Sequence, residues 1–262
     1  MLDIDPVELK LLVHAPVGHG KTALLGSAIN DPRLMPALLA DFEGGYRSIR
    51  SRVATIPLDE LKKLKDPPTD RIIRVRLRRW EDIDELYDVL QQDDNPYKTF
   101  FGDSLSEIHY LSLEGVILSD WKKDRSKYDP DQPQQSQYLK ALSQMRKFVR
   151  YFRDLEGMHT VFTATTMDVE DARTRRGKAQ PNLIGKFTQE VAALMDWVGY
   201  LGIQEDEKNG VRTVTRILCT GPSDRYVAKG RNDLDTDGQL PEFVTNPTLP
   251  MILDYLEGKR KA

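Results

Sequence analysis

The chain has 262 residues, of which 39% are hydrophobic and 30% are charged, and its formal net charge is −3. This length allows one sizeable α/β core, and we expect a single domain over residues 1–262. The charge balance excludes a globally basic nucleic-acid-binding chain, so contact with nucleic acid would need a local basic patch. Cys219 is the only cysteine, which excludes a disulfide framework, and no apolar run is long enough to cross a membrane. We therefore expect a cytoplasmic protein with no membrane partner.

The first two thirds of the chain alternate between predicted strands and predicted helices. We expect buried strands at residues 9–15, 37–43, 99–104 and 159–166, and helices at 20–29, 80–92, 105–121 and 138–157. Residues 71–77 alternate apolar and basic side chains, which predicts an exposed strand. This order predicts an α/β fold with a mainly parallel central sheet and helices on both faces.

The last third of the chain has a different pattern. Residues 122–137 and 167–186 are polar, and we expect both to be long loops. A helix is predicted at 187–197, and the apolar runs at 197–204 and 211–220 flank a turn, which predicts a C-terminal antiparallel β-hairpin. Residues 248–258 predict a closing helix.

The segment "HAPVGHGKT", residues 14–22, follows the first predicted strand and begins the first predicted helix. Its last three residues have the spacing of a phosphate loop, in which backbone N–H groups and the lysine bind phosphate and the threonine hydroxyl binds Mg²⁺. Ala15 replaces the usual first glycine, which costs little where φ is negative. We expect the following residues to contact ATP: Ala15, Pro16, Val17, Gly18, His19, Gly20, Lys21, Thr22 and Ala23.

Two carboxylates stand at the ends of other predicted strands. Asp103 follows the strand that begins at residue 99, where it could complete the Mg²⁺ site with Thr22; a helix cap is the alternative. Glu43 ends the second strand and could orient or activate the attacking water; a solvated turn carboxylate is the alternative. Because the carboxyl ends of parallel strands meet at one edge, we expect both side chains to converge on the γ-phosphate.

Four motifs occur in one order along residues 9–234: "APVGHGKT", "ADFEGG", "FFGDS" and "AKGRND". With this set the chain resembles the RecA-like recombination ATPases, and among them the compact phage proteins of the Sak-type single-strand-annealing group. The resemblance implies a RecA-like P-loop NTPase core with ATP and Mg²⁺ as cofactors. It also implies a DNA-stimulated ATPase that promotes annealing or recombination, in the host cytoplasm if a phage encodes it.

The resemblance also assigns roles to individual residues. It makes Glu43 the residue that activates water, and it makes Thr166 or Thr165 the sensor of the γ-phosphate. Lys229 and Arg231 resemble a basic pair that relatives insert onto the γ-phosphate of a neighbouring subunit; a surface basic pair is the alternative. We therefore expect a homo-oligomer, either a ring or a short filament, with ATP sites between protomers.

Residues 167–186 correspond to a DNA-binding loop of the family. Its basic side chains are Arg173, Arg175, Arg176, Lys178 and Lys186. A loop of this kind could follow the phosphate backbone of single-stranded DNA with an affinity that falls as salt rises; a solvated charged loop is the alternative. A single-stranded-DNA-binding protein is a further expected partner.

Two other functions stay open at this point. A P-loop kinase of a small molecule or nucleotide would close an arginine-bearing lid over the phosphates, and residues 167–186 could form it. A nucleotide-switched phage scaffold would use the same site without DNA. The "ADFEGG" motif favours hydrolysis, because its glutamate is suited to activating water.

Overall fold

The computed structural model describes residues 7–170, 177–208, 210–232 and 238–261. Within these residues, ten strands form one sheet in the order β10-β9-β8-β1-β6-β5-β2-β4-β3, with β7 paired to β6 outside this path. The strands are β1 (Lys10–Ala15), β2 (Ala37–Asp41), β3 (Val53–Thr55), β4 (Ile72–Arg76), β5 (Thr99–Asp103), β6 (His159–Glu170), β7 (Gly177–Pro181), β8 (Trp197–Lys208), β9 (Val211–Cys219) and β10 (Phe243–Thr245). The helices are α1 (Lys21–Gly26), α2 (Leu58–Leu61), α3 (Glu81–Leu90), α4 (Leu105–Lys123), α5 (Gln135–Arg153), α6 (Phe187–Leu194) and α7 (Leu249–Leu256), with 3₁₀ helices η1 (Ser27–Asn30) and η2 (Gly45–Arg52).

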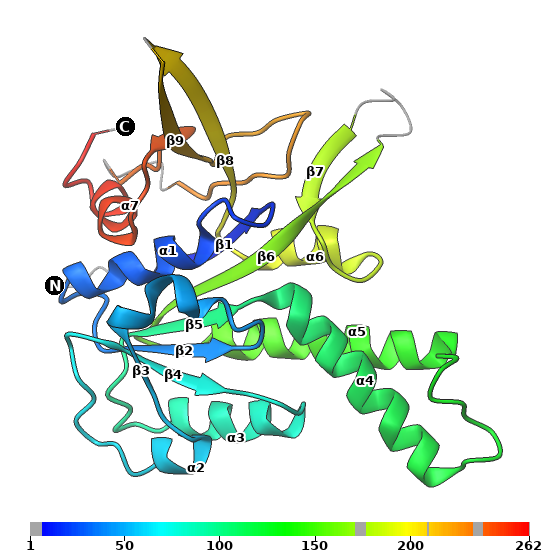
Figure 1. Cartoon of the computed structure of the whole chain (residues 1–262). Helices are drawn as coiled ribbons and strands as arrows, with labels where there is room; N and C mark the ends of the chain where they lie inside the picture. Colours follow the sequence, from blue (N-terminus) through cyan, green and yellow to red (C-terminus); the bar gives the residue numbers. More distant parts are fainter. Residues whose placement is uncertain (1–6, 171–176, 209, 233–237, 262) are drawn as a thin grey trace, which may run out of the picture.

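The sheet is covered by helices on both faces (Figure 1). Strands β3, β4, β2, β5, β6, β1 and β8 run parallel, and β9 and β10 continue the sheet in antiparallel pairs. Successive side chains point to opposite faces, so Leu12 and Phe100 join the core under α3 to α6, whereas Leu11 and Phe101 join the core under α1 and α7. The predicted parallel sheet and the C-terminal hairpin are confirmed. Among the described residues, no helix combines the length and apolarity needed to span a bilayer.

Two hairpins extend beyond the edge of the sheet at which β1 ends. Ala15, the last residue of β1, pairs with Thr165 of β6, and β6 then continues to Glu170 and pairs with β7. The expectation of a structureless loop over residues 167–186 is therefore wrong in part, because Met167 to Glu170 alternate apolar and polar side chains as a strand does. The hairpin of β8 and β9 projects from the same edge (Figure 1).

The prediction of an exposed strand at residues 71–77 is wrong. Strand β4 lies inside the sheet between β2 and β3, and its first four residues are buried. Arg74 can be buried there because its guanidinium donates to the carboxylate of Asp41 at 2.7 and 2.6 Å. A buried ion pair thus produces the same sequence pattern as a solvated face.

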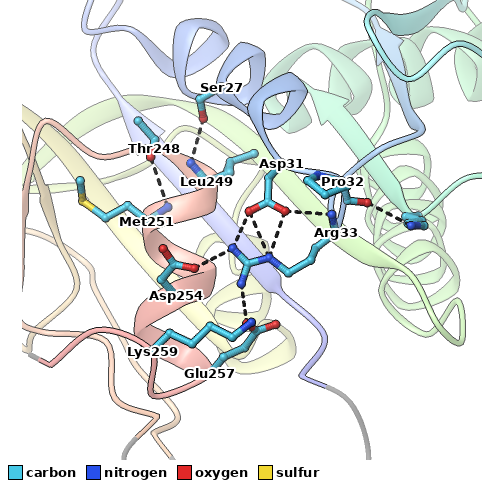
Figure 2. A network of polar contacts seen from close by, with 11 residues as sticks. Ser27, Asp31, Pro32, Arg33, Thr248, Leu249, Met251, Asp254, Glu257 and Lys259 are labelled. Atoms are coloured by element: carbon cyan, nitrogen blue, oxygen red, sulfur yellow. Dashed lines mark hydrogen bonds and ion pairs between the residues drawn. The ribbon is translucent and has the colours of Figure 1, made fainter.

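Ion pairs and a hydrogen bond connect the C-terminal helix α7 to the segment that follows α1 (Figure 2). Arg33 forms ion pairs with Asp31, with Asp254 at 2.6 Å and with Glu257. The hydrogen bond from Arg33 holds the pKa of the Asp31 carboxyl below its usual value. The backbone N–H of Leu249 also donates to the Ser27 hydroxyl at 2.8 Å. These contacts fix both the start and the end of α7 beside η1 and the segment that follows it.

Candidate nucleotide-binding site

The loop between β1 and α1 has the backbone of a phosphate loop. Gly18 and Gly20 have positive φ angles of 84° and 100°, which favour glycine at both positions. Ala15 is still part of β1 and has no positive φ, which explains why alanine is acceptable where the pattern usually has glycine. The ammonium of Lys21 is folded back onto the loop and donates to the Ala15 carbonyl at 3.0 Å.

A cleft of about 430 Å³ brings the phosphate loop together with the segment that follows β2. Its lining residues are Val17, Gly18, Gly20, Lys21, Thr22, Ala23, Glu43, Gly44, Gly45, Ser48 and Arg216. Burial lowers the pKa of Lys21, while the carboxylates of Glu43 and Asp103 counter this shift. Lys21 and Glu43 thus line one cleft, and the charges of Glu43 and Asp103 both act on the Lys21 ammonium.

Asp103 is fixed by hydroxyl groups from two sides. The Thr22 hydroxyl donates to Oδ2 at 2.9 Å, and the Thr163 hydroxyl of β6 donates to Oδ1. Asp103 is only 1% exposed, and this burial raises its pKa, although the hydrogen bonds from Thr163 and Thr22 counter the shift. Asp103 and Thr22 thus lie together as expected, and Thr163 is a partner that the sequence reasoning missed.

The oxygen atoms at this point suit Mg²⁺. A carboxylate and a hydroxyl are hard oxygen donors, and a Cβ built on Gly45 would lie 3.0 Å from Thr22 Oγ1 and 3.2 Å from Asp103 Oδ2. The missing side chain of Gly45 therefore keeps access to both oxygens open. The described residues contain no group of three or more His, Cys, Asp or Glu that could hold a metal. Mg²⁺ commonly binds through one or two protein ligands together with phosphate oxygens, and this donor set fits that mode.

Glu43 stands on a turn that is held in place by Asp41. The Asp41 carboxylate accepts a hydrogen bond from the Gly44 N–H at 2.8 Å, and it forms an ion pair with Arg74 at 2.6 Å. The Arg74 guanidinium lies 3.8 Å from the centre of the Tyr46 ring, just after the turn. Asp41 and Arg74 thus fix both sides of the turn that carries Glu43.

A second carboxylate lies near Glu43. Glu107 is in the first turn of α4, and both burial and the charge of Glu43 raise its pKa. The sequence reasoning did not single out Glu107. Glu107 could have been predicted from its position, because it lies four residues after Asp103 in the first turn of a predicted helix.

The hydroxyl of Thr166 points toward β1. It contacts His14 Nδ1 at 3.0 Å, and His14 Nε2 contacts the Val227 carbonyl at 2.7 Å. The Thr165 hydroxyl donates to the Ser106 hydroxyl oxygen at 2.9 Å, and the Thr165 N–H donates to the same oxygen at 3.0 Å. Of the β6 threonines, Thr163 is the one that contacts Asp103. A γ-phosphate sensor role for Thr166 or Thr165 stays a prediction.

Lys229 and Arg231 have partners within the chain. The Lys229 ammonium donates to the carbonyls of Ala192 and Met195 at the end of α6, at 2.9 and 2.8 Å. Arg231 forms an ion pair with Asp196 at 2.8 Å. These contacts give both side chains a local structural role, and their action on a neighbouring subunit stays a prediction.

The expected DNA-binding residues fall in two groups. Arg173, Arg175 and Arg176 lie outside the described residues. Lys178 is half-buried on β7, paired in register with Val169, and Lys186 is exposed just before α6. The two lysines are thus on the segment that follows β6, and their contact with DNA stays a prediction.

The strand order, the phosphate loop and the cleft define a P-loop NTPase fold with a mostly parallel central sheet. Residues 7–232 match a family described as AAA domain, and the chain belongs to that family. No protein among the curated sequences matches the chain.

Three solved structures are among those with partial similarity to this chain. An ATPase from the type III secretion system of pathogenic bacteria is 14% identical with a TM-score of 0.44, over 74% of this chain and 51% of that one, so the chain spans about half of its length. The genome packaging NTPase B204 from Sulfolobus turreted icosahedral virus 2, in complex with ATP-gammaS, is 10% identical with a TM-score of 0.38, over 75% and 76% of the two chains. The RadB recombinase is 13% identical with a TM-score of 0.42, over 79% of each chain.

Proposed function

We propose that the protein is a single-domain ATPase that hydrolyses ATP in the cleft beside the phosphate loop. The observation that carries this proposal is the joint lining of that cleft by Lys21, Thr22 and Glu43, with Asp103 bonded to Thr22. A carboxylate suited to activating water thereby faces the lysine that would bind the transferred phosphate.

In this proposal each side chain has a separate task in hydrolysis. The loop N–H groups and Lys21 hold the β- and γ-phosphates. Thr22 and Asp103 would hold Mg²⁺, which neutralises charge on these phosphates when it is bound. Glu43 orients a water molecule and accepts its proton as the water oxygen bonds to the γ-phosphorus and the bond to the β-phosphate oxygen breaks. Glu107 is a second carboxylate near Glu43, and burial together with the charge of Glu43 raises the pKa of Glu107.

We further propose that the protein binds single-stranded DNA and promotes annealing or recombination, as the Sak-type phage proteins do. The support is the hairpin of β6 and β7, which continues directly from the edge of the sheet where Asp103 lies. Lys178 lies on β7 of this hairpin, and Lys186 follows the hairpin just before α6. Basic side chains there would contact the DNA backbone, so a change at the γ-phosphate could reach the DNA along β6.

The proposed active form is a ring or short filament in the cytoplasm. Lys229 and Arg231 would act on the ATP of the neighbouring subunit, and their present contacts at the end of α6 would have to be exchanged for phosphate contacts. A cation supplied in this way neutralises the charge that develops during hydrolysis.

The test is the rate of ATP hydrolysis with and without single-stranded DNA, together with DNA binding over a series of salt concentrations. The proposal predicts stimulation by DNA and an affinity that falls steeply as salt rises. Phosphate transfer to a small acceptor, with no response to DNA, would instead identify a kinase. ATP binding with neither response would identify a nucleotide-switched scaffold.

A further inference from the structure

Arg216 of strand β9 reaches across to the phosphate loop. Its Nε donates to the carbonyl of His19 at 3.0 Å. The backbone of Arg216 is fixed by Asn246, whose Oδ1 accepts from the Arg216 N–H at 3.1 Å and whose N–H donates to the Arg216 carbonyl at 2.7 Å. Arg216 therefore projects its side chain over the loop from a strand that is held at this position.

The arginine side chain lies directly against Gly20. A Cβ built on Gly20 would come within 2.6 Å of Arg216 Nε. Gly20 is thus required here both by its positive φ angle and by the approach of Arg216. This close approach places a second cation on the phosphate loop, beside Lys21.

Arg216 also stands between two hollows. It lines the cleft of about 430 Å³ that contains Glu43, and it lines a cavity of about 690 Å³ that begins at Gly20 and Ala23 and continues toward Asn246. Glu43 lines only the smaller of the two hollows. The γ-phosphate, which is the group removed by hydrolysis, would therefore lie in the smaller cleft. A guanidinium on the border would meet the phosphates closer to the nucleoside.

The charge of Arg216 is not balanced within the described part of the chain, where no carboxylate forms an ion pair with it. Arg212, four residues earlier on the same strand, has a different environment, because it forms an ion pair with Glu205 of β8. The two arginines therefore make a matched pair in which one is neutralised and the other faces the cleft.

We infer that Arg216 is a phosphate-binding residue that acts within its own subunit, on the α- and β-phosphates of a bound nucleotide. This inference rests on the proposed function. A guanidinium suits the task because it stays charged at all accessible pH values and offers planar paired donors to phosphate oxygens. Neither the phosphate-loop motif nor the basic residues near the C-terminus accounts for this role.

The inference is tested by measuring the dissociation constants of ATP and ADP by calorimetry for the full chain and four variants. We expect R216A and R216Q each to weaken both nucleotides by about tenfold, R216K to weaken them by only about threefold, and R212A to match the wild type. ADP is the informative ligand, because it retains the α- and β-phosphates and lacks the γ-phosphate.

Several results would overturn the inference. Glutamine can still donate to the His19 carbonyl but carries no charge, so wild-type affinity in R216Q would mean that Arg216 only holds the loop. Unchanged binding in R216A, or weaker ATP binding with unchanged ADP binding, would also contradict it. If the wild type binds neither ATP nor ADP, the proposed function fails together with the inference. If the wild type binds both nucleotides and R216A binds them with the same dissociation constants, only the inference is overturned.

Discussion

His14 is completely buried at the end of the strand that leads into the phosphate loop. The Val227 carbonyl can only accept a hydrogen bond, so His14 Nε2 must carry the proton and Nδ1 must accept from the Thr166 hydroxyl. The ring also lies against Tyr200, with 5.4 Å between ring centres. A neutral imidazole with one fixed tautomer therefore joins β1, β6 and the segment before Lys229.

This environment predicts a pH-dependent stability. Burial lowers the pKa of His14 from 6.5 to about 4, and the nearby charge of Lys21 adds to the shift. The unfolded chain then binds a proton at higher pH than the folded chain, so stability is full above pH 6.5 and falls as the pH drops toward 4. We expect His14 to account for a loss of about 3 kcal/mol over that window.

Urea unfolding at several pH values, in the wild type and in His14→Asn, measures this contribution. Carboxylates and other histidines titrate in both proteins, so the difference between the two pH profiles isolates His14. Parallel profiles would show that His14 does not contribute to the loss.

At the scale of elements, strand β4 links the core to the site. Its buried Arg74 neutralises Asp41, and Asp41 in turn holds the Gly44 N–H of the turn that carries Glu43. Removing one partner of a buried ion pair leaves the other charge without compensation.

We expect Arg74→Ala to lower the free energy of unfolding by about 3 kcal/mol. Arg76→Ala is the matched control, because Arg76 is exposed on the same strand, and it should change stability by less than about 0.5 kcal/mol. Urea denaturation compares the two variants. Equal losses of stability would argue against a special role for the Asp41–Arg74 pair.

The sequence was a good guide to features that are contiguous in the chain. The phosphate loop, the strands around it and the hairpin of β8 and β9 follow from local spacing and periodicity. The positions of Thr163 and Arg216 could not be predicted in this way, because they depend on how β6 pairs with β5 and how β9 folds back over the loop. The burial of Arg74 could not be predicted either, because its ion-pair partner Asp41 lies on another strand.

In the proposed assembly, two subunits share one ATP site. The Lys229 ammonium donates hydrogen bonds to backbone carbonyls at the end of α6. In an assembly it would have to leave those carbonyls for the phosphate of a neighbour.

We expect Lys229→Ala to retain ATP binding and to lose about tenfold or more of its turnover. Because Lys229 and Glu43 would come from different subunits, mixing Lys229→Ala with Glu43→Gln should restore part of the activity. Thermal unfolding of Lys229→Ala separates this effect from a loss of α6. Full turnover in Lys229→Ala alone would exclude the shared site.

We propose above that the cleft between the phosphate loop and Glu43 hydrolyses ATP, and two variants separate binding from hydrolysis there. The most direct measurement is ATP binding and ATP turnover in Lys21→Ala and Glu43→Gln beside the wild type. We predict that Lys21→Ala loses affinity for ATP by about tenfold or more, because it removes the ammonium that would bind the phosphates. Glu43→Gln should bind ATP as the wild type does and hydrolyse it about 100-fold more slowly, because it removes the water-activating carboxylate. Wild-type turnover in Glu43→Gln would mean that this cleft does not hydrolyse ATP with Glu43 as the water-activating group.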